Sequence, residues 1–285
     1  MARVVVITHE HDRFLGKRDL LLRRGSPYLL FDVLQDLKRR GHSVRIQQGL
    51  STTFSADIAV LHVDATTTPA DYLAYARGFP VCLNVGAADI SKRRISGAVL
   101  GKDDPWQGPV IVKSNLNNQG IPETLLNRRS RRAGKPPPFP HLPILPPYEV
   151  HATLGDVPDD VFDSDDLVVE KFIPEREPDG FAVRFWVFCG ESERCTRYIS
   201  PNGLVKASET IRREPVPVPD ELRERRRELG FDYGKFDFVM HEGRAILLDA
   251  NKTPGRPQNL VKMFAAGASV LADGFDGLIR RAGWK

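Results

Sequence analysis

Short apolar runs alternate with a helical pattern over the first part of the chain. The apolar positions of residues 28–40 fall on one face of a helix, with Ser26 as its N-cap, Pro27 at its first position and Gly41 at its end. The other predicted elements are strands at residues 3–8, 43–47, 57–63 and 81–84 and a helix at residues 69–77. Strands that alternate with helices favour a parallel α/β layer. A polar cluster at residues 9–12 follows the first strand, as a solvated loop, a substrate-binding loop or, less favoured, a metal site.

The last third of the chain alternates apolar and polar residues with the period of two that a half-buried strand requires. His241, Glu242 and Gly243 separate two such runs and predict a hairpin turn. Residues 219–229 predict a charged amphipathic helix that ends at Gly230. The other predicted elements are strands at residues 167–173, 181–189, 194–199, 232–240 and 244–249 and a closing helix over most of residues 258–281. This pattern indicates a β-rich domain.

The middle of the chain is more polar and richer in proline. Residues 110–113 predict a short strand that ends in Lys113, and a polar stretch at residues 114–120 follows it. Seven prolines occur in residues 136–147, which excludes helix and central strand, so this segment should run extended between packed elements. The basic run at residues 128–135 is either a solvated surface or a region that attracts an anionic substrate.

Composition sets limits on the class of protein. The chain has 285 residues, of which 41% are hydrophobic and 27% charged; this is typical of a soluble globular protein with two or three units and argues against a disordered or membrane protein. The net charge of +4 is too small over this length to indicate nucleic-acid binding. The three cysteines have neither disulfide-framework nor metal-binding spacing. Without a recognisable signal peptide or bilayer-spanning run, we expect a cytoplasmic protein.

The hairpin around Gly243 carries the most informative chemistry. If the turn is centred on that glycine, Asp237 lies opposite Asp249, and the Cβ atoms of opposed residues are about 5 Å apart. Lys235 and Asn251 lie two residues away along their strands and share that face. Two carboxylates and an amide suit Mg²⁺, although a solvated hairpin face is the alternative. The opposite face is expected to be core and carries Phe236, Phe238, Met240, Ile246 and Leu248.

These residues resemble the metal-binding end of the ATP-grasp fold, whose superfamily includes D-alanine–D-alanine ligase and glutathione synthetase. The match consists of residues 235–237 and residues 247–255. The family pattern has a glutamate at the place of Asp249. Because aspartate is shorter by one methylene, the number of bound metal ions, one or two, stays open. The metal ligands that the resemblance implies are Asp237, Asp249 and Asn251.

Three further segments occur in the same order as in the family. Residues 109–113 resemble the strand whose lysine reaches the nucleotide phosphates, and residues 84–92 resemble a segment with an earlier phosphate-binding lysine. Residues 168–173 resemble the strand that binds adenine. Residues 114–120 replace the family's glycine-rich loop, and their Asn and Gly residues tolerate left-handed backbone. The nucleotide-binding residues that the resemblance implies are Lys92, Lys113, Glu170, Lys171, Phe172 and Ile173, with Glu177 or Asp179 at the ribose.

The resemblance implies an α/β (α+β) protein with the ATP-grasp fold and an N-terminal parallel α/β domain. We expect three units: an N-terminal α/β domain at residues 1–86, a central nucleotide-lid region with the proline-rich segment at residues 87–166, and a C-terminal β-rich ATP-grasp domain at residues 167–285. ATP would then bind between the last two units.

The activity that the resemblance implies is an ATP-dependent ligase that joins a carboxylate to an amine or thiol through an acyl phosphate. Its cofactors would be ATP and one or two Mg²⁺ ions, with Mn²⁺ as an alternative. The expected partners are small-molecule acid and amine substrates, and we expect no binding to nucleic acid or membrane. A homodimer is one possible oligomeric state. A phosphotransferase and a non-catalytic ATP-binding module are the alternative functions. The implied catalytic residues are Lys235, which would steady the transition state, and Arg184 and Arg197, which either bind an anion or reach solvent.

Overall fold

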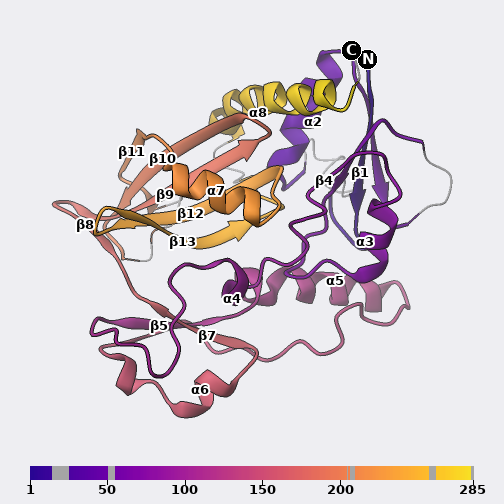
Figure 1. The fold of residues 1–285 in the computed structure, drawn as a ribbon. Helices are drawn as coiled ribbons and strands as arrows, with labels where there is room; N and C mark the ends of the chain where they lie inside the picture. Colours follow the sequence, from indigo (N-terminus) through magenta and orange to yellow (C-terminus); the bar gives the residue numbers. More distant parts are fainter. Residues whose placement is uncertain (15–25, 51–54, 204, 206–208, 257–260, 284–285) are drawn as a thin grey trace.

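A computed structural model describes residues 1–14, 26–50, 55–203, 205, 209–256 and 261–283 (Figure 1). The N-terminal layer is a parallel sheet with the strand order β2-β1-β3-β4, as the sequence predicts. Its elements are β1 (Arg3–Thr8), α2 (Leu29–Arg39), β2 (Ser43–Gln48), β3 (Ile58–Leu61), α3 (Ala70–Ala76) and β4 (Cys82–Leu83). Alternate residues of β1 pack on the α2 side and the α3 side, so the central strand is buried on both faces.

Helix α2 begins later than the sequence predicts. Tyr28 is its N-cap and has extended backbone, with φ of −101° and ψ of 140°, so Pro27 lies outside the helix. The cause is tertiary, because Tyr28 pairs with Gly255 as an isolated antiparallel β-bridge. Ser26 still contributes its hydroxyl, which accepts the Tyr28 backbone N–H at 3.3 Å.

The middle of the chain forms a three-stranded antiparallel sheet with the order β6-β5-β7. Its elements are α4 (Lys92–Ile95), β5 (Val110–Ser114), α5 (Ile121–Arg132), β6 (Glu149–His151), α6 (Asp159–Asp163) and β7 (Leu167–Lys171). Strand β7, which the sequence analysis groups with the last unit, pairs with β5 in this sheet. Helix α5 contains most of the basic run and was not predicted, because its arginines conceal a narrow apolar stripe that includes Leu126.

The C-terminal part is a six-stranded antiparallel sheet with the order β11-β10-β9-β12-β13 and with β8 paired to β9. Its elements are β8 (Glu175–Glu177), β9 (Gly180–Cys189), β10 (Ser192–Ser200), β11 (Arg212–Pro215), α7 (Asp220–Glu228), β12 (Tyr233–His241), β13 (Arg244–Asn251) and α8 (Val261–Arg281). One face packs on α7 through the cluster that contains Trp186, Phe236 and Phe238. The first residues of the predicted closing helix, 258–260, lie outside the described part of the chain.

Helix α8 connects the large sheet to the N-terminal layer (Figure 1). Its buried Leu271 and Phe275 share one apolar cluster with Leu30 of α2 and Cys189 of β9. Within the described residues, none of the helices has the combination of length and apolar character that crossing a bilayer requires. The close approach of α8 to β9 depends on Gly274, where an added Cβ would lie 1.8 Å from the Cys189 carbonyl oxygen.

Gly274→Ala should therefore destabilise the protein by about 1–3 kcal/mol, because the added methyl group forces α8 away from β9. Gly277→Ala in the same helix is the matched control, since the nearest atom to its added Cβ, Arg280 Nη2, is 3.9 Å away. The control should stabilise the protein by up to about 1 kcal/mol through helix propensity. Urea denaturation of both variants measures the difference, and equal effects would contradict the close packing.

Candidate active site

The hairpin of β12 and β13 places two carboxylates opposite each other. Glu242 and Gly243 have φ of 49° and 79°, which is typical of a two-residue hairpin turn rather than one centred on Gly243. A β-bulge with Leu248 as the extra residue then shifts the register. Asp237 consequently pairs with Asp249, as the sequence predicts, although the register at the turn is not the expected one.

The bulge also changes which side chains of β13 face the core. Leu247 is 4% exposed and packs with Phe236 and Phe238. Ile246 and Leu248 instead pack in a cluster on the other face. The prediction that these two residues belong to the core face is therefore wrong, because strand alternation shifts by one residue at the bulge.

Four charged side chains meet on that other face and form what we call the charged quartet: Lys92, Lys235, Asp237 and Asp249. The Lys235 ammonium donates to Asp237 Oδ2 at 2.9 Å, and the Lys92 ammonium, brought in by α4, donates to Asp249 Oδ1. Burial by itself lowers the pKa of each lysine, but the facing carboxylate outweighs burial and raises the pKa of both. The quartet is thus two partly buried ion pairs side by side.

The oxygen set on this face fits a divalent cation. Asp237 Oδ1 is buried and makes no hydrogen bond, although the Lys235 ammonium lies 2.9 Å from it as an ion pair. Burial raises the pKa of the Asp237 carboxyl. A divalent cation could accept this oxygen as a ligand if the Lys235 ammonium turned to another partner. Asn251 stands opposite Lys235, and its side-chain oxygen accepts the Thr253 backbone N–H at 2.8 Å. Among the described residues no three His, Cys, Asp or Glu side chains converge as a metal site, so Mg²⁺ would also need phosphate oxygens or water.

A cavity of about 550 Å³, the first cavity, lies between the three-stranded sheet and the quartet face of the large sheet. Lys113, Lys171, Phe172 and Ile173 line it, as the sequence analysis expects of nucleotide-binding residues. Its apolar floor consists of Val183, Phe185, Val239 and Leu248. Glu170 is fully buried and accepts a hydrogen bond from Lys113 Nζ at 2.7 Å. Its Oε2 is thus the partner of Lys113, whereas its buried Oε1 makes no hydrogen bond, and the expected contact of Glu170 with adenine stays a prediction.

The loop after β5 ends in three successive left-handed residues. Asn118, Gln119 and Gly120 have φ of 45°, 55° and 67°, and α5 begins at the next residue. In such a turn successive backbone N–H groups form a concave surface that suits an anion. Gln119 lines the first cavity. The left-handed backbone that the sequence analysis expects in this loop is therefore present with a single glycine.

A second cavity of about 530 Å³ adjoins the first and shares Lys92, Tyr148 and Asp249 with it. Tyr148 was missed by the sequence analysis. The available signal was an aromatic residue at the end of the proline-rich segment, whose extended course delivers it to the quartet. Burial raises the pKa of the Tyr148 hydroxyl. The N-terminal layer, α5 and the segment after β13 complete the wall with Tyr28, Asp64, Arg129 and Thr253.

A buried hydrogen-bond relay leads from the segment after β13 into the N-terminal layer. Thr253 Oγ1 donates to Asp64 Oδ1 at 2.7 Å. The Tyr28 hydroxyl lies 3.0 Å from Asp64 Oδ2 and 3.2 Å from Asp12 Oδ2, but its single proton serves only one of them. Burial, with a further contribution from Asp64, raises the pKa of Asp12 to about 7. Asp12, from the polar cluster at residues 9–12, is therefore buried and not part of a solvated loop.

The segment after β13, residues 252–256, is bonded to the N-terminal layer, and we call it the anchor segment. The Lys252 ammonium is buried and donates to Thr68 Oγ1 at 2.7 Å and to the Ala88 carbonyl oxygen at 2.9 Å. Backbone hydrogen bonds join residues 27–29 to the last three residues of the anchor segment. The quartet therefore has a fixed position relative to the relay.

The two arginines expected to be catalytic lie on the face of the large sheet away from the quartet. Arg184 and Arg197 stand opposite each other on neighbouring strands, and both form ion pairs with Glu175. Arg197 also pairs with Glu177, and Asp179 is an exposed residue beside the same cluster. None of these residues is among the described residues that line the two cavities. Both arginines lie away from the cavities because successive side chains along a strand point to opposite faces of the sheet. We assign these arginines a structural role.

Asp12→Asn should make stability less sensitive to pH. A carboxyl whose pKa is raised from 3.8 to about 7 favours the protonated form in the folded state, so the wild type loses stability as pH rises through this range. The loss is up to about 1.4 kcal/mol per pH unit. Urea denaturation should show that the variant gains relative to wild type between pH 5 and pH 8, whereas the exposed Asp103→Asn does not. A pH-independent difference would contradict the burial of this carboxyl.

Comparisons with known proteins support the fold that the sequence resemblance implies. The sequence matches no protein-family model and no curated protein. The structure is similar to D-alanine–D-alanine ligase from Bacillus anthracis, with 15% identity and a TM-score of 0.52 over 99% of this chain and 97% of that one. It is also similar to a RimK domain ATP-grasp protein from Sphaerobacter thermophilus, with 16% identity and a TM-score of 0.50 over 96% and 99%. The chain therefore has the ATP-grasp fold.

Proposed function

We propose that the protein is an ATP-dependent ligase that joins a carboxylate to an amine through an acyl phosphate. The observation that carries this proposal is the junction of two cavities at Lys92, Tyr148 and Asp249. One cavity has the apolar floor and lysines that suit a nucleotide, and the other ends at buried carboxylates. A reaction centre between two such chambers suits the transfer of an activated acid from a nucleotide to a second substrate.

In this proposal the nucleotide occupies the first cavity. Phe172 and Ile173 contact the base, and Lys92 and Lys113 meet the phosphates together with the left-handed loop. Asp237, Asp249 and Asn251 would hold Mg²⁺, which neutralises charge on the transferring γ-phosphoryl group. Each lysine already faces a carboxylate in this structure, so lysine and carboxylate could exchange these partners for phosphate and metal.

Both chemical steps then balance. A carboxylate oxygen of the acid attacks the γ-phosphorus, the bond from phosphorus to the bridging oxygen breaks, and ADP leaves. The amine nitrogen next attacks the acyl carbon of the acyl phosphate, the C–N bond forms, and phosphate leaves with the electrons of the C–O bond. The amine loses one proton in this step. Lys235, one of the residues proposed as catalytic, would stabilise the negative charge of the acid and of its transferring phosphate.

The relay of Asp12, Tyr28 and Asp64 supports an amine as the second substrate. Two buried carboxylates share one hydroxyl proton, and the pKa of both is raised by burial. A protonated amine at Asp64 would neutralise this pair, and the pair would then accept the proton that the ammonium must lose before its nitrogen can attack. The second proton, which is lost as the C–N bond forms, would leave with the phosphate. Thr253 connects this proton acceptor to the strand that carries Asn251.

Removing the proposed metal ligands should abolish turnover. Asp237→Asn, Asp249→Ala and Asn251→Ala should each lower Mg²⁺-dependent ADP release by about 10²-fold or more in a screen of acids with amines, because charge neutralisation at the γ-phosphate is lost. Glu242→Gln, at the exposed turn of the same hairpin, should be unaffected. A ligase yields ADP, free phosphate and a condensed product. Phosphorylated product without free phosphate would favour a phosphotransferase, and full activity of the ligand variants would refute the metal site.

Asp64→Asn should separate the two half-reactions. Hydroxylamine is largely neutral at pH 7 and traps acyl phosphates without needing a carboxylate partner. We expect hydroxamate formation from the acid to stay within about twofold of wild type, while condensation with the amine falls by about 10²-fold, the usual contribution of a general base. Tyr28→Phe should show a smaller loss in the same direction. Equal losses in both assays would instead indicate that Asp64 acts on the fold or on the nucleotide.

A further inference from the structure

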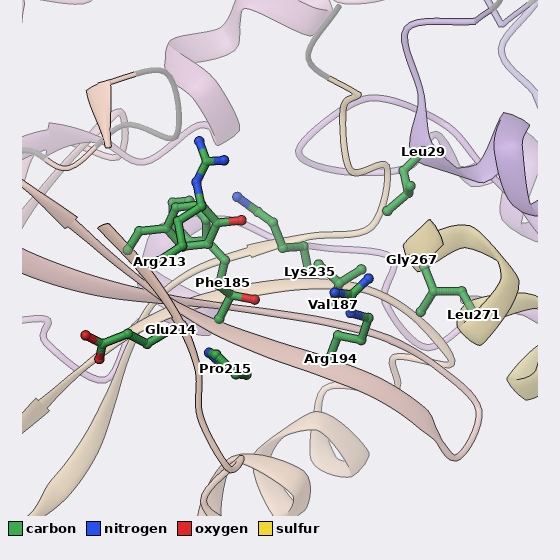
Figure 2. Close-up of a pocket in the computed structure, with 12 residues that line it drawn as sticks. Leu29, Phe185, Val187, Arg194, Arg213, Glu214, Pro215, Lys235, Gly267 and Leu271 are labelled. Atoms are coloured by element: carbon green, nitrogen blue, oxygen red, sulfur yellow. The ribbon is translucent and has the colours of Figure 1, made fainter. Parts of the chain in front are cut away.

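A third cavity opens on the same face of the large sheet, between the strands and α8. It has a volume of about 290 Å³ (Figure 2). Figure 2 shows Phe185 and Val187 on the strand side of this groove and Gly267 and Leu271 of α8 on the other. The groove shares Lys235 with the second cavity and Phe185 with the first, so it meets both at the charged quartet. The functions proposed above do not use it.

The strand register sets the length of the groove. Lys235, Val187 and Arg194 stand directly opposite one another on β12, β9 and β10. Opposed residues share a face, so a cation lies at each end of this row with an aliphatic side chain between them. Two strand spacings place the Cα atoms of the two cations about 10 Å apart. Leu271 of α8 and the Phe185 ring add apolar surface along the row.

The charges of the groove are mostly positive. Lys235, Arg194 and Arg213 line it, against a single acidic residue, Glu214. The Arg194 side chain makes no hydrogen bond or ion pair with any residue in the part of the chain that the structure describes. Its guanidinium lies against α8 at Gly267, where an added Cβ would be 2.9 Å from Arg194 Nη1. The glycine in this helix thus leaves room for the arginine beside the groove.

From these observations we propose that the third cavity binds the acid substrate, and that this acid carries a second anionic group on an apolar spacer, as an aliphatic dicarboxylate does. The carboxylate to be activated lies at Lys235, beside Asp237 and the nucleotide phosphates. The spacer packs on Val187, Phe185 and Leu271, where burial of each methylene is favourable. The distal carboxylate pairs with Arg194. This inference rests on the proposed ligase function for its choice of the reacting end.

Isothermal titration of the full-length protein with suberate and octanoate tests the distal contact, since these acids share a chain length and differ in the second carboxylate. We expect suberate to bind about fivefold more tightly than octanoate, the gain typical of an accessible ion pair. Arg194→Gln should remove this preference and leave octanoate binding unchanged. Arg280→Gln, an exposed change at the far end of α8, should preserve the preference. Equal binding of the two acids, or a preference that survives Arg194→Gln, would overturn the proposal.

Lys235→Met provides the second arm, because it removes the cation that both acids share. The affinity for both acids should then fall by about fivefold or more, and the preference for suberate should be retained. A loss of the preference in this variant, with octanoate unaffected, would reverse the assigned orientation and refute the proposal. Binding with this pattern but without ADP release would leave the groove standing and count against the ligase. Ligation of monocarboxylates with no preference for diacids would uphold the ligase and reject the groove as the diacid site.

Discussion

The bonding of the anchor segment to the N-terminal layer is the constraint on which the rest of the site depends. Residues 252–256 continue directly from β13, so every hydrogen bond they make fixes the strand that carries Asp249 and Asn251. Burying the Lys252 ammonium is costly, and burial lowers its pKa to about 7. Its acceptors on the N-terminal layer offset that cost and exist only when the two parts are docked. The same docking prevents Pro27 from starting α2, because residues 27–29 bond to the anchor.

Docking in turn gathers three cavities around the charged quartet. Its lysines and carboxylates neutralise one another at the point where the cavities meet, so a fold with several buried charges carries little net charge there. Such pairs contribute little to stability, but they keep cations and oxygen ligands positioned for phosphate and metal. The Asp12–Tyr28–Asp64 relay differs, because its carboxylates face a hydroxyl and no cation among the described residues bonds to them. The proposed amine would supply that charge.

Prediction from sequence worked best where periodicity and turn signals agree. The β9–β10 and β12–β13 hairpins and the parallel N-terminal layer follow from alternation and from punctuation by glycine. Helix α5 was missed because five basic residues in and after it dominate its composition, although it packs through a narrow stripe. The arginines of β9 and β10 show the converse failure. Their position between apolar neighbours does not reveal whether an anion or the glutamates of β8 will meet them.

The sequence by itself determined which residues stand together on the hairpin, because alternation along two paired strands is a local property. The ATP-grasp fold followed from the resemblance of four segments to that family. The same resemblance assigned Lys92 and Lys113 to the nucleotide phosphates and the paired aspartates to the metal. Only the tertiary structure decided that Leu248 faces the cleft, that Glu170 bonds to Lys113, and that Tyr148, Asp64 and Asp12 join the site. The physical reason is that a β-bulge, an ion-pair partner and a cavity wall arise from contacts between segments far apart in the chain, which no local pattern records.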